Sequence, residues 1–293
     1  MRVFVTGATG LVGSAVVAEL IGHGHTVYAL ARSEVAVTVA EAAGAQAVRG
    51  ALADLEILRA GAAETDGVIH LAFANDFSST DALAMAIAEE TAALATLGEA
   101  LIGSGRPLVT VSGTPFISGR PSTEADPAFT EGPVGGRGRA VTAALGLASR
   151  GVRSSAIRLP RTVHNKGLGG FAGLLTNIAR QRGVAGYPGD GLQRWPAVHA
   201  LDAAVLFRIA LERAESGTSW HAVADEGDKV QDIAAVIGRR LALPVESVAA
   251  ESFGPLGPIF LADQPSSSTY TRETLDWTPT HPSLLEDLEN ILS

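Results

Sequence analysis

The stretch that decides the fold runs from Val3 to Gly13 and reads VFVTGATGLVG. Its glycines, Gly7, Gly10 and Gly13, stand at G-x-x-G-x-x-G spacing between a strand-like run and a helix-like run. In such a turn the first glycine makes a tight bend, the second lets the backbone approach a pyrophosphate, and the third lets helix and strand pack closely. The N-terminus of the helix then faces the phosphates. The stretch therefore predicts a dinucleotide-binding turn.

The first half of the chain alternates β-branched runs with alanine-rich segments of helical period, which is typical of βαβ units and a parallel sheet covered on both faces. The predicted strands are Arg2–Thr6, Thr26–Ala31, Ala45–Arg49, Gly67–Leu71, Pro107–Ser112, Ser154–Leu159 and Ser219–Ala224. The clearest predicted helices are Leu11–Ile21, Asp81–Leu101 and Arg139–Ala148. This pattern predicts an α/β fold, a doubly wound parallel Rossmann sheet with a smaller C-terminal substrate lobe.

The regular alternation breaks after Pro160, where a glycine-rich stretch and a turn-rich stretch follow. We therefore expect residues 1–162 and 196–224 to form the dinucleotide-binding domain. Residues 163–195 and 225–293 are expected to form the substrate-binding lobe.

The composition excludes several classes of protein. Of 293 residues, 46% are hydrophobic and 18% charged, which favours a compact globular fold over disorder. A net charge of −9 opposes binding to nucleic acid or to an anionic membrane surface. The absence of cysteine excludes disulfides and thiolate catalysis, and the scattered histidines show no metal-ligand spacing, so we predict no metal site. No signal-peptide pattern or run of ~18 apolar residues is present, so we expect a cytoplasmic protein.

Four later motifs follow the glycine turn. Their sequences and their order resemble those of the extended and atypical short-chain dehydrogenase/reductase family, the NAD-dependent epimerase/dehydratase-like proteins. The motifs are Gly67–Ala72, Leu108–Gly113, Arg158–Pro160 and Trp195–Ala204. The resemblance implies that the first passes the nicotinamide ribose and that the second delivers an active-site serine. It also implies a nicotinamide nucleotide as cofactor.

The end of the second predicted strand, Tyr28–Ser33, predicts which nucleotide is preferred. An acidic residue there would accept hydrogen bonds from the ribose 2′-hydroxyl, whereas an arginine pairs with a 2′-phosphate. This end carries Ala31, Arg32 and Ser33 and no carboxylate, so we predict a preference for NADP(H) over NAD(H). The alternative is that Arg32 is an ordinary solvated side chain, or that it stacks on the adenine without discriminating between the two nucleotides.

The cofactor is expected to lie along a set of residues drawn from these motifs. Near the adenine, Ala51 replaces the family's usual acidic residue, so Leu52 and backbone groups must hold the ring. The residues expected to contact the cofactor are Gly7, Thr9, Gly10, Leu11, Val12, Gly13, Arg32, Ser33, Leu52, Leu71, Ala72, Phe73, Val111, Arg137, Pro160 and Val163.

The family's catalytic Tyr-x-x-x-Lys pair is missing. In the family, the tyrosine transfers a proton and the lysine tunes it and holds the ribose. The only tyrosines are Tyr28, Tyr187 and Tyr270, and the only lysines are Lys166 and Lys229. Counting along the chain puts the pair's positions near Pro133 and Arg137. Arginine can clamp a ribose or a carboxylate but keeps its proton, so it cannot replace lysine in proton relay.

Catalysis would therefore depend on other residues. Each candidate also has an interpretation in which it serves only the fold. The candidates are Ser112, Thr114, Arg137, His199 and Tyr187, with His164 as a further proton donor. His199 is equally well explained as a structural histidine. Arg194 and Trp195 form either a substrate platform or packing inside the lobe.

These observations favour an NADP(H)-dependent oxidoreductase that reduces a carbonyl or an activated double bond of an apolar small molecule. The alternatives are a non-catalytic NADP(H)-sensing regulatory protein and a nucleotide-sugar epimerase/dehydratase. The partner expected is a small-molecule substrate. A homodimer is possible through the helices Asp81–Leu101 and Arg139–Ala148, although their alanine-rich faces fit equally well against their own sheet.

Overall fold

The computed structural model describes residues 1–74, 79–166 and 169–290, and the chain divides into two compact units. Unit 1 comprises Met1–Gly113, Pro127–Arg158 and Ala204–Trp220. Unit 2 comprises Thr114–Asp126, Leu159–Ala203 and His221–Ser293. Within the described ranges, no helix is long and apolar enough to cross a membrane.

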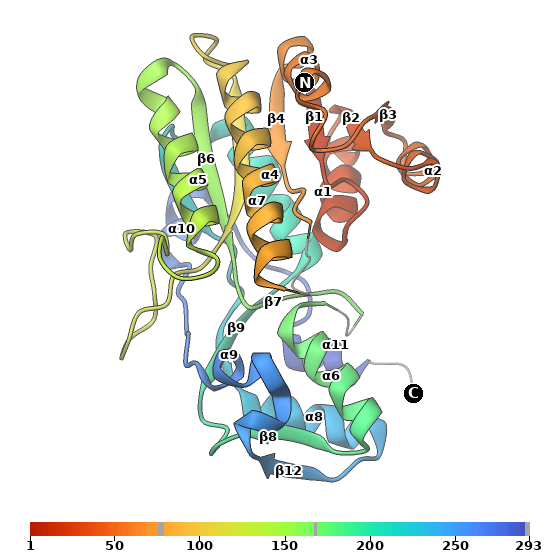
Figure 1. The fold of residues 1–293 in the computed structure, drawn as a ribbon, viewed down its shortest axis with the longest axis vertical. Helices are drawn as coiled ribbons and strands as arrows, with labels where there is room; N and C mark the ends of the chain where they lie inside the picture. Colours follow the sequence, from red (N-terminus) through yellow and green to blue (C-terminus); the bar gives the residue numbers. More distant parts are fainter. Residues whose placement is uncertain (75–78, 167–168, 291–293) are drawn as a thin grey trace. The chain divides into compact units, whose positions relative to one another are not determined.

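Unit 1 is built on a seven-stranded sheet with the strand order β10-β6-β5-β4-β1-β2-β3 (Figure 1). Its elements are β1 Arg2–Thr6, α1 Leu11–Gly22, β2 Thr26–Ala31, α2 Glu34–Ala42, β3 Gln46–Arg49, α3 Leu55–Glu64, β4 Gly67–His70, α4 Thr80–Glu99, β5 Pro107–Gly113, α5 Gly135–Gly146, the 3-10 helix Leu147–Arg150, β6 Arg153–Leu159, α7 Ala200–Arg213 and β10 Thr218–His221. Strand β1 pairs in parallel with both β2 and β4, so the chain winds outwards from the centre in two directions. The predicted doubly wound α/β fold is confirmed.

One apolar core cluster of unit 1 lies between the sheet and the helices α3, α4 and α5. Phe4, Val68 and Leu108 point from β1, β4 and β5 into this cluster and are completely buried. Leu94 and Leu97 of α4 meet them, and α4 also packs along α3 and α5 (Figure 1). The apolar face of α4 therefore packs against its own sheet. This was the alternative to a homodimer contact through this helix.

Helix α5 begins at Gly135, four residues before its predicted start at Arg139. Glycine disfavours helix, so the run Gly135–Gly138 masks the start in the sequence. Tertiary packing overrides this propensity. A Cβ atom on Gly138 would lie 2.0 Å from the Phe129 carbonyl oxygen, and one on Gly136 would lie 2.5 Å from the Ile87 side chain. The glycines thus permit close approach to α4 and to the preceding loop.

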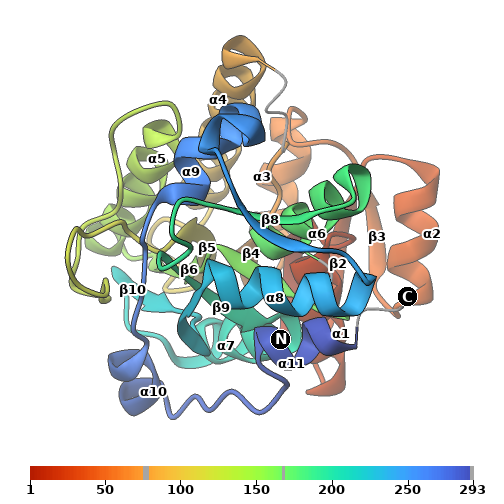
Figure 2. The same ribbon diagram turned by 90° about the horizontal axis from the view of Figure 1, so that it is seen from below.

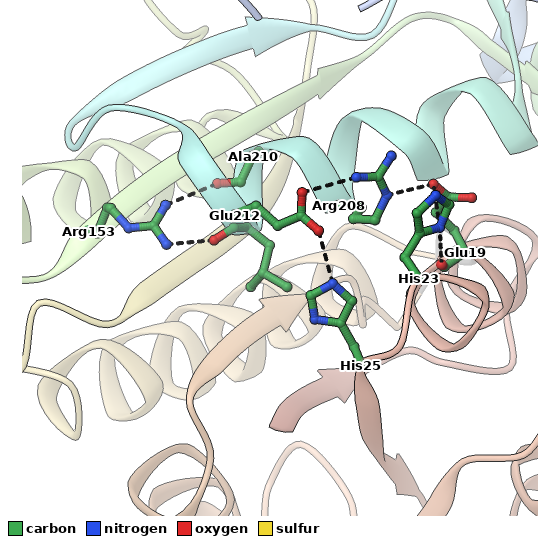
Figure 3. A network of polar contacts seen from close by, with 8 residues as sticks. Glu19, His23, His25, Arg153, Arg208, Ala210 and Glu212 are labelled. Carbon is green, nitrogen blue, oxygen red and sulfur yellow. Dashed lines mark hydrogen bonds and ion pairs between the residues drawn. The ribbon is translucent and has the colours of Figure 1, made fainter. Parts of the chain in front are cut away.

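A polar network fastens α7 to the first βαβ unit (Figure 3). Arg208 donates to Glu19 of α1 at 2.7 Å and to Glu212 at 3.0 Å. The same Glu212 lies 3.0 Å from the ring of His25. At the end of α7, Arg153 donates to the backbone carbonyl of Leu211 at 2.6 Å. These charges are partly shielded from water, which favours a fixed position for α7.

Unit 2 contains a three-stranded sheet in the order β11-β9-β7 and a two-stranded sheet of β12 and β8. Its elements are β7 Thr162–His164, α6 Gly170–Arg182, β8 Ala185–Pro188, β9 Arg194–His199, β11 Asp225–Lys229, α8 Val230–Leu241, β12 Val245–Val248, the 3-10 helix Ala250–Leu256, α9 Gly257–Leu261, α10 Thr269–Leu275 and α11 Leu284–Glu289. Trp195, Ile233 and Phe260 are fully buried in its core. Helices α8 and α11 lie side by side (Figure 2).

The predicted strand Ser219–Ala224 is shorter in the structure. Strand β10 ends at His221. Beyond it, the backbone N–H of Ala224 donates to Ala197 of β9 at 2.9 Å, and the sheet of unit 2 continues with β11 from Asp225. The alternating apolar pattern continues through both environments, which is why the sequence did not show the change of sheet.

Candidate functional site

Two glycines of the turn, Gly7 and Gly13, are required by close contacts within the chain, whereas Gly10 is not. Gly7 has a φ of +72°, and a Cβ atom on it would lie 2.8 Å from the Ala72 nitrogen. A Cβ on Gly13 would lie 1.9 Å from the Gly7 carbonyl oxygen. On Gly10, by contrast, the nearest atom would be 3.5 Å away, an ordinary contact. The chain leaves open space at Gly10, which fits a group that approaches the backbone from outside.

The N-terminus of α1 is free to bind an anion. Gly10 is the N-cap, no side chain caps the helix, and its first turn contains no acidic residue. Thr9 and Leu11 are exposed and Val12 is half-buried beside it. The first N–H groups of a helix have no partner within the helix, and they favour phosphate. The turn therefore fits the pyrophosphate of a dinucleotide.

Thr6 ties this turn to the end of β4. Its hydroxyl oxygen accepts the N–H groups of Leu71 and Ala72, each at 3.2 Å, and lies 2.8 Å from Nδ1 of His70. Because that oxygen already accepts two bonds, its own proton goes to His70 Nδ1. His70 is thus neutral, and burial, followed by the charge of Arg137, lowers its pKa to about 4.

Two arginines lie at the shared edge of β2 and β3. Arg32 is exposed and makes no ion pair with any residue that the structure describes, while Ser33 caps α2 by accepting the Ala36 N–H at 3.2 Å. Arg49 stands opposite Ala31 in the β2–β3 register and forms an ion pair with Glu34. It was not among the predicted site residues. The parallel pairing of the two predicted strands could have indicated Arg49, because the last residues of neighbouring parallel strands lie together at one edge of the sheet.

A cavity of about 540 Å³ opens beside this edge of unit 1. Leu52, Ala53 and Leu55 line it after β3, and the remaining lining is mostly apolar. The other lining residues are Ala74, Ala82, Met85, Ala86, Glu89 and Ala92. An apolar cavity of this kind fits a flat ring better than a charged group.

Arg137 makes two parallel hydrogen bonds with Glu90 of α4. Its Nε and Nη2 atoms each lie 2.7 Å from a carboxylate oxygen, and the guanidinium lies 3.9 Å above the Phe73 ring. Glu90 was not among the predicted site residues, although it interrupts the apolar stripe formed by Leu83, Leu94 and neighbouring positions. An acidic residue on a buried face was a usable signal of a buried partner.

Ser112, the last residue but one of β5, has a buried hydroxyl without a hydrogen-bond partner among the described residues, and its neighbour Val111 is buried. Thr114 belongs to unit 2, where its backbone N–H donates to Leu159 at 2.9 Å and its buried hydroxyl is also without a partner in the described part of the chain. Buried hydroxyls usually have partners, so both are free to bind a ligand.

The remaining predicted residues lie in unit 2. Pro160 and Val163 are buried, and the half-buried Tyr187 packs against the core. Trp195 is completely buried beside Phe171 and Phe260, so packing inside the lobe, rather than a substrate platform, explains it. Arg194 is held by Asp263 at 2.8 Å.

His164 and His199 are buried side by side. Nδ1 of His164 lies 2.8 Å from a carboxylate oxygen of Asp287, and Nδ1 of His199 accepts the Leu201 N–H at 3.2 Å. Burial, and then the neighbours His164 and His281, hold the pKa of His199 below its ordinary value.

Comparison with known proteins identifies the family. Residues 3–134 match the model of the "NAD dependent epimerase/dehydratase family". Over 292 residues, 98% of each chain, the protein is 42% identical to "Uncharacterized protein C2A9.02" of Schizosaccharomyces pombe. The chain belongs to the NAD dependent epimerase/dehydratase family. The resemblance predicted from the motifs is thus confirmed.

Two further proteins are similar to this chain, one over part of its sequence and one in its fold. It is 34% identical over 145 residues, 43% of each chain, to a 4-hydroxy-2-methyl-3-oxo-4-farnesyl-3,4-dihydroquinoline-1-oxide ketoreductase of Stigmatella aurantiaca. Its fold matches that of a UDP-glucose 4-epimerase from Thermotoga maritima, with a TM-score of 0.81, 20% identity and coverage of 99% and 97% of the two chains.

Proposed function

We propose that this protein is an NADP(H)-dependent oxidoreductase that reduces a carbonyl or an activated double bond of an apolar small molecule. The observation that carries the proposal is the open space at Gly10, beside an uncapped helix N-terminus. Gly7 and Gly13 are explained by contacts within the chain, whereas Gly10 is explained by a pyrophosphate that approaches its backbone.

The residues of unit 1 have distinct tasks in this proposal. The N–H groups of Thr9 and of Leu11 to Gly13 bind the pyrophosphate, and Arg32 pairs with the 2′-phosphate. The hydroxyl of Ser33 already accepts a backbone N–H and keeps its proton to donate to the same phosphate. The adenine enters the cavity next to Leu52.

The nicotinamide half of the cofactor is assigned to the ends of the central strands. Leu71, Ala72, Phe73 and Val111 border it in unit 1. When bound, the nicotinamide supplies or accepts the hydride. Arg137 keeps one nitrogen, Nη1, for the ribose, because Glu90 takes the other two.

The substrate oxygen is assigned to Ser112, whose buried hydroxyl lacks a partner among the described residues. A serine orients this oxygen but is a weak acid, so the proton comes from water or from another side chain. The ketoreductase relative supports carbonyl reduction as the reaction class.

The test has two stages. NADPH and NADH are titrated separately against the full chain by energy transfer from tryptophan to the nicotinamide. The oxidation of NADPH is then followed with a panel of apolar ketones and enones. Tighter binding of NADPH and turnover of at least one compound class are expected. Absence of binding by both nucleotides would refute the proposal.

The alternatives give different results in the same assays. An epimerase or dehydratase, as the family match and the similar UDP-glucose 4-epimerase suggest, would convert a nucleotide sugar without net consumption of NADPH. A sensor would bind NADPH and turn over nothing. The absence of tyrosine and lysine from α5 is the observation that favours the sensor.

A further inference from the structure

Three imidazoles and two carboxylates gather in unit 2. His164 and His199 are paired residues in the parallel register of β7 and β9, so their side chains share a face of the sheet. Their ring centroids are 5.3 Å apart, edge to face, and the ring of His281 stacks on His199 at 4.9 Å. Asp202 and Asp287 complete the group, each 2.8 Å from one histidine.

The two carboxylates are used differently. Asp202 accepts the backbone N–H groups of Thr280 and His281 at 2.9 and 3.1 Å, besides the ring of His281. It therefore holds the segment before α11 in place, and the pair Asp202–His281 is explained by the fold. Asp287 instead turns from α11 towards His164.

His164, His199 and Asp287 each offer one ligand atom, and these atoms all lie within 4.8 Å of one another. All three residues are buried, which distinguishes them from acidic groups scattered over a surface. Two imidazole nitrogens and one carboxylate oxygen form a donor set used by Zn²⁺ and related divalent transition ions.

A second observation concerns Nε2 of His164. The residue is only 1% exposed, and this nitrogen has no hydrogen-bond partner among the described residues. Buried polar atoms nearly always have a partner, so an orphan next to two other ligand atoms points to a missing ligand. Nδ1 of His164 lies 2.8 Å from the Asp287 carboxylate, on the other side of the ring from Nε2, so Asp287 gives up this hydrogen bond when it ligates an ion bound at Nε2.

We propose that His164, His199 and Asp287 form a site for one divalent transition-metal ion. The ligands come from β7, β9 and α11, so a bound ion fastens the last helix of unit 2 to its three-stranded sheet. At tetrahedral angles, zinc–ligand bonds of about 2.1 Å hold the ligand atoms about 3.4 Å apart. The widest pair, within 4.8 Å, therefore closes by up to roughly 1.4 Å on binding.

Sequence spacing alone could not indicate this site. Between His164 and His199 lies a helix and a strand, and Asp287 follows 88 residues later (287 − 199). The parallel register of β7 and β9 and the packing of α11 bring the three together.

The test uses the full chain without a histidine tag, stripped with a chelator. Co²⁺ is titrated first, followed by its visible absorption, and Zn²⁺ is then added as competitor. One equivalent of Co²⁺ with the absorption of a low-coordinate site is expected, and Zn²⁺ should displace it. Zn²⁺ should also raise the Tm, because an ion that binds only the folded state stabilises it.

Two variants and one control make the result specific. Asp287→Asn keeps an acceptor for His164 and removes the charge, and His164→Gln removes both ring nitrogens. Each should lose the bound equivalent and the Tm shift. His23→Gln, which changes a half-exposed histidine of α1's C-cap, should bind Co²⁺ like the wild type.

The wild-type titration decides the matter even if a variant fails to fold. Less than one equivalent of Co²⁺ together with an unchanged Tm would overturn the proposal, as would binding that survives in folded Asp287→Asn and His164→Gln. The proposal is independent of the cofactor, because the titration contains no nucleotide.

Discussion

Arg137 of α5 and Glu90 of α4 form a two-point ion pair, with both nitrogen–oxygen distances at 2.7 Å. The Glu90 side chain is only 4% exposed and that of Arg137 is 29% exposed. The arginine that stands near the family's lysine position is thus bound to the protein itself. Its charge neutralises a buried carboxylate and simultaneously fixes the guanidinium over Phe73.

The first prediction concerns this pair. Arg137→Ala should lower the free energy of unfolding by about 3–5 kcal/mol, because it leaves a buried charge without a partner. The double variant Glu90→Leu/Arg137→Met should lose less stability than the sum of Glu90→Leu and Arg137→Met. Urea unfolding of the wild type, these two single variants and the double variant measures this. Arg59→Ala, at an exposed pair with Glu56, should cost less than about 1 kcal/mol. Strict additivity would contradict the coupling.

The second prediction separates Gly10 from Gly13. Gly10→Ala should fold with an almost unchanged Tm and lose most of its affinity for NADPH, because its Cβ enters the space assigned to the pyrophosphate. Gly13→Ala should fail to fold or lose much stability, since its Cβ would overlap the Gly7 carbonyl. Thermal melts and nucleotide titration check both. Full nucleotide affinity in Gly10→Ala would count against a phosphate at this position.

The third prediction tests the nucleotide preference. Arg32→Ala should weaken NADPH binding by about 10–100-fold, which corresponds to a charged hydrogen bond of about 1.5–3 kcal/mol. NADH binding should change little, because NADH has no 2′-phosphate. Arg49→Ala shows how much the second arginine at this edge contributes. Equal losses for both nucleotides in Arg32→Ala would argue against the assignment.

The fourth prediction concerns pH and His70. Its folded-state pKa is lowered to about 4 from 6.5 by burial, so below pH 6.5 the unfolded chain binds the proton first. The stability from this residue is therefore complete above pH 6.5 and is lost as the pH falls towards 4. The loss amounts to roughly 3 kcal/mol, at 1.36 kcal/mol per pH unit. Urea unfolding across this range should give a smaller slope for His70→Asn than for the wild type. Identical slopes would show that His70 does not carry the effect.

The fifth prediction concerns Asp228 of β11. Burial, then the charges of Asp225 and Asp232, raise its pKa to about 6, and one carboxylate oxygen is without a partner in the described part of the chain. Because the folded state favours the protonated form, ionisation destabilises the protein as the pH rises through 6. Asp228→Asn should raise the Tm at pH 7, and the gain should fade towards pH 4. Glu246→Gln, an exposed change of equal charge, should have little effect at either pH.

Several elements followed directly from the sequence because their signals are local. The strand β2 was predicted with its observed bounds, and the glycine turn was placed correctly between β1 and α1. Alternation of β-branched and helical segments predicted the doubly wound sheet for the same reason, since periodicity reports which face of each element is buried.

Other features depended on contacts between distant residues. Glycine propensity hid the start of α5, which packing against Ile87 and Phe129 supports. The partners Glu90 and Arg137 are 47 residues apart, and Arg49 meets Ala31 only through strand register.

The sequence by itself determined the family and the place of the glycine turn between β1 and α1, because residue identity and short spacing are sufficient for each. Tertiary structure alone decided that a Cβ atom on Gly10 would meet no clash within the chain, that Trp195 is core and that His164, His199 and Asp287 meet. The physical reason is that burial and proximity arise from the packing of whole elements, and no local pattern records them.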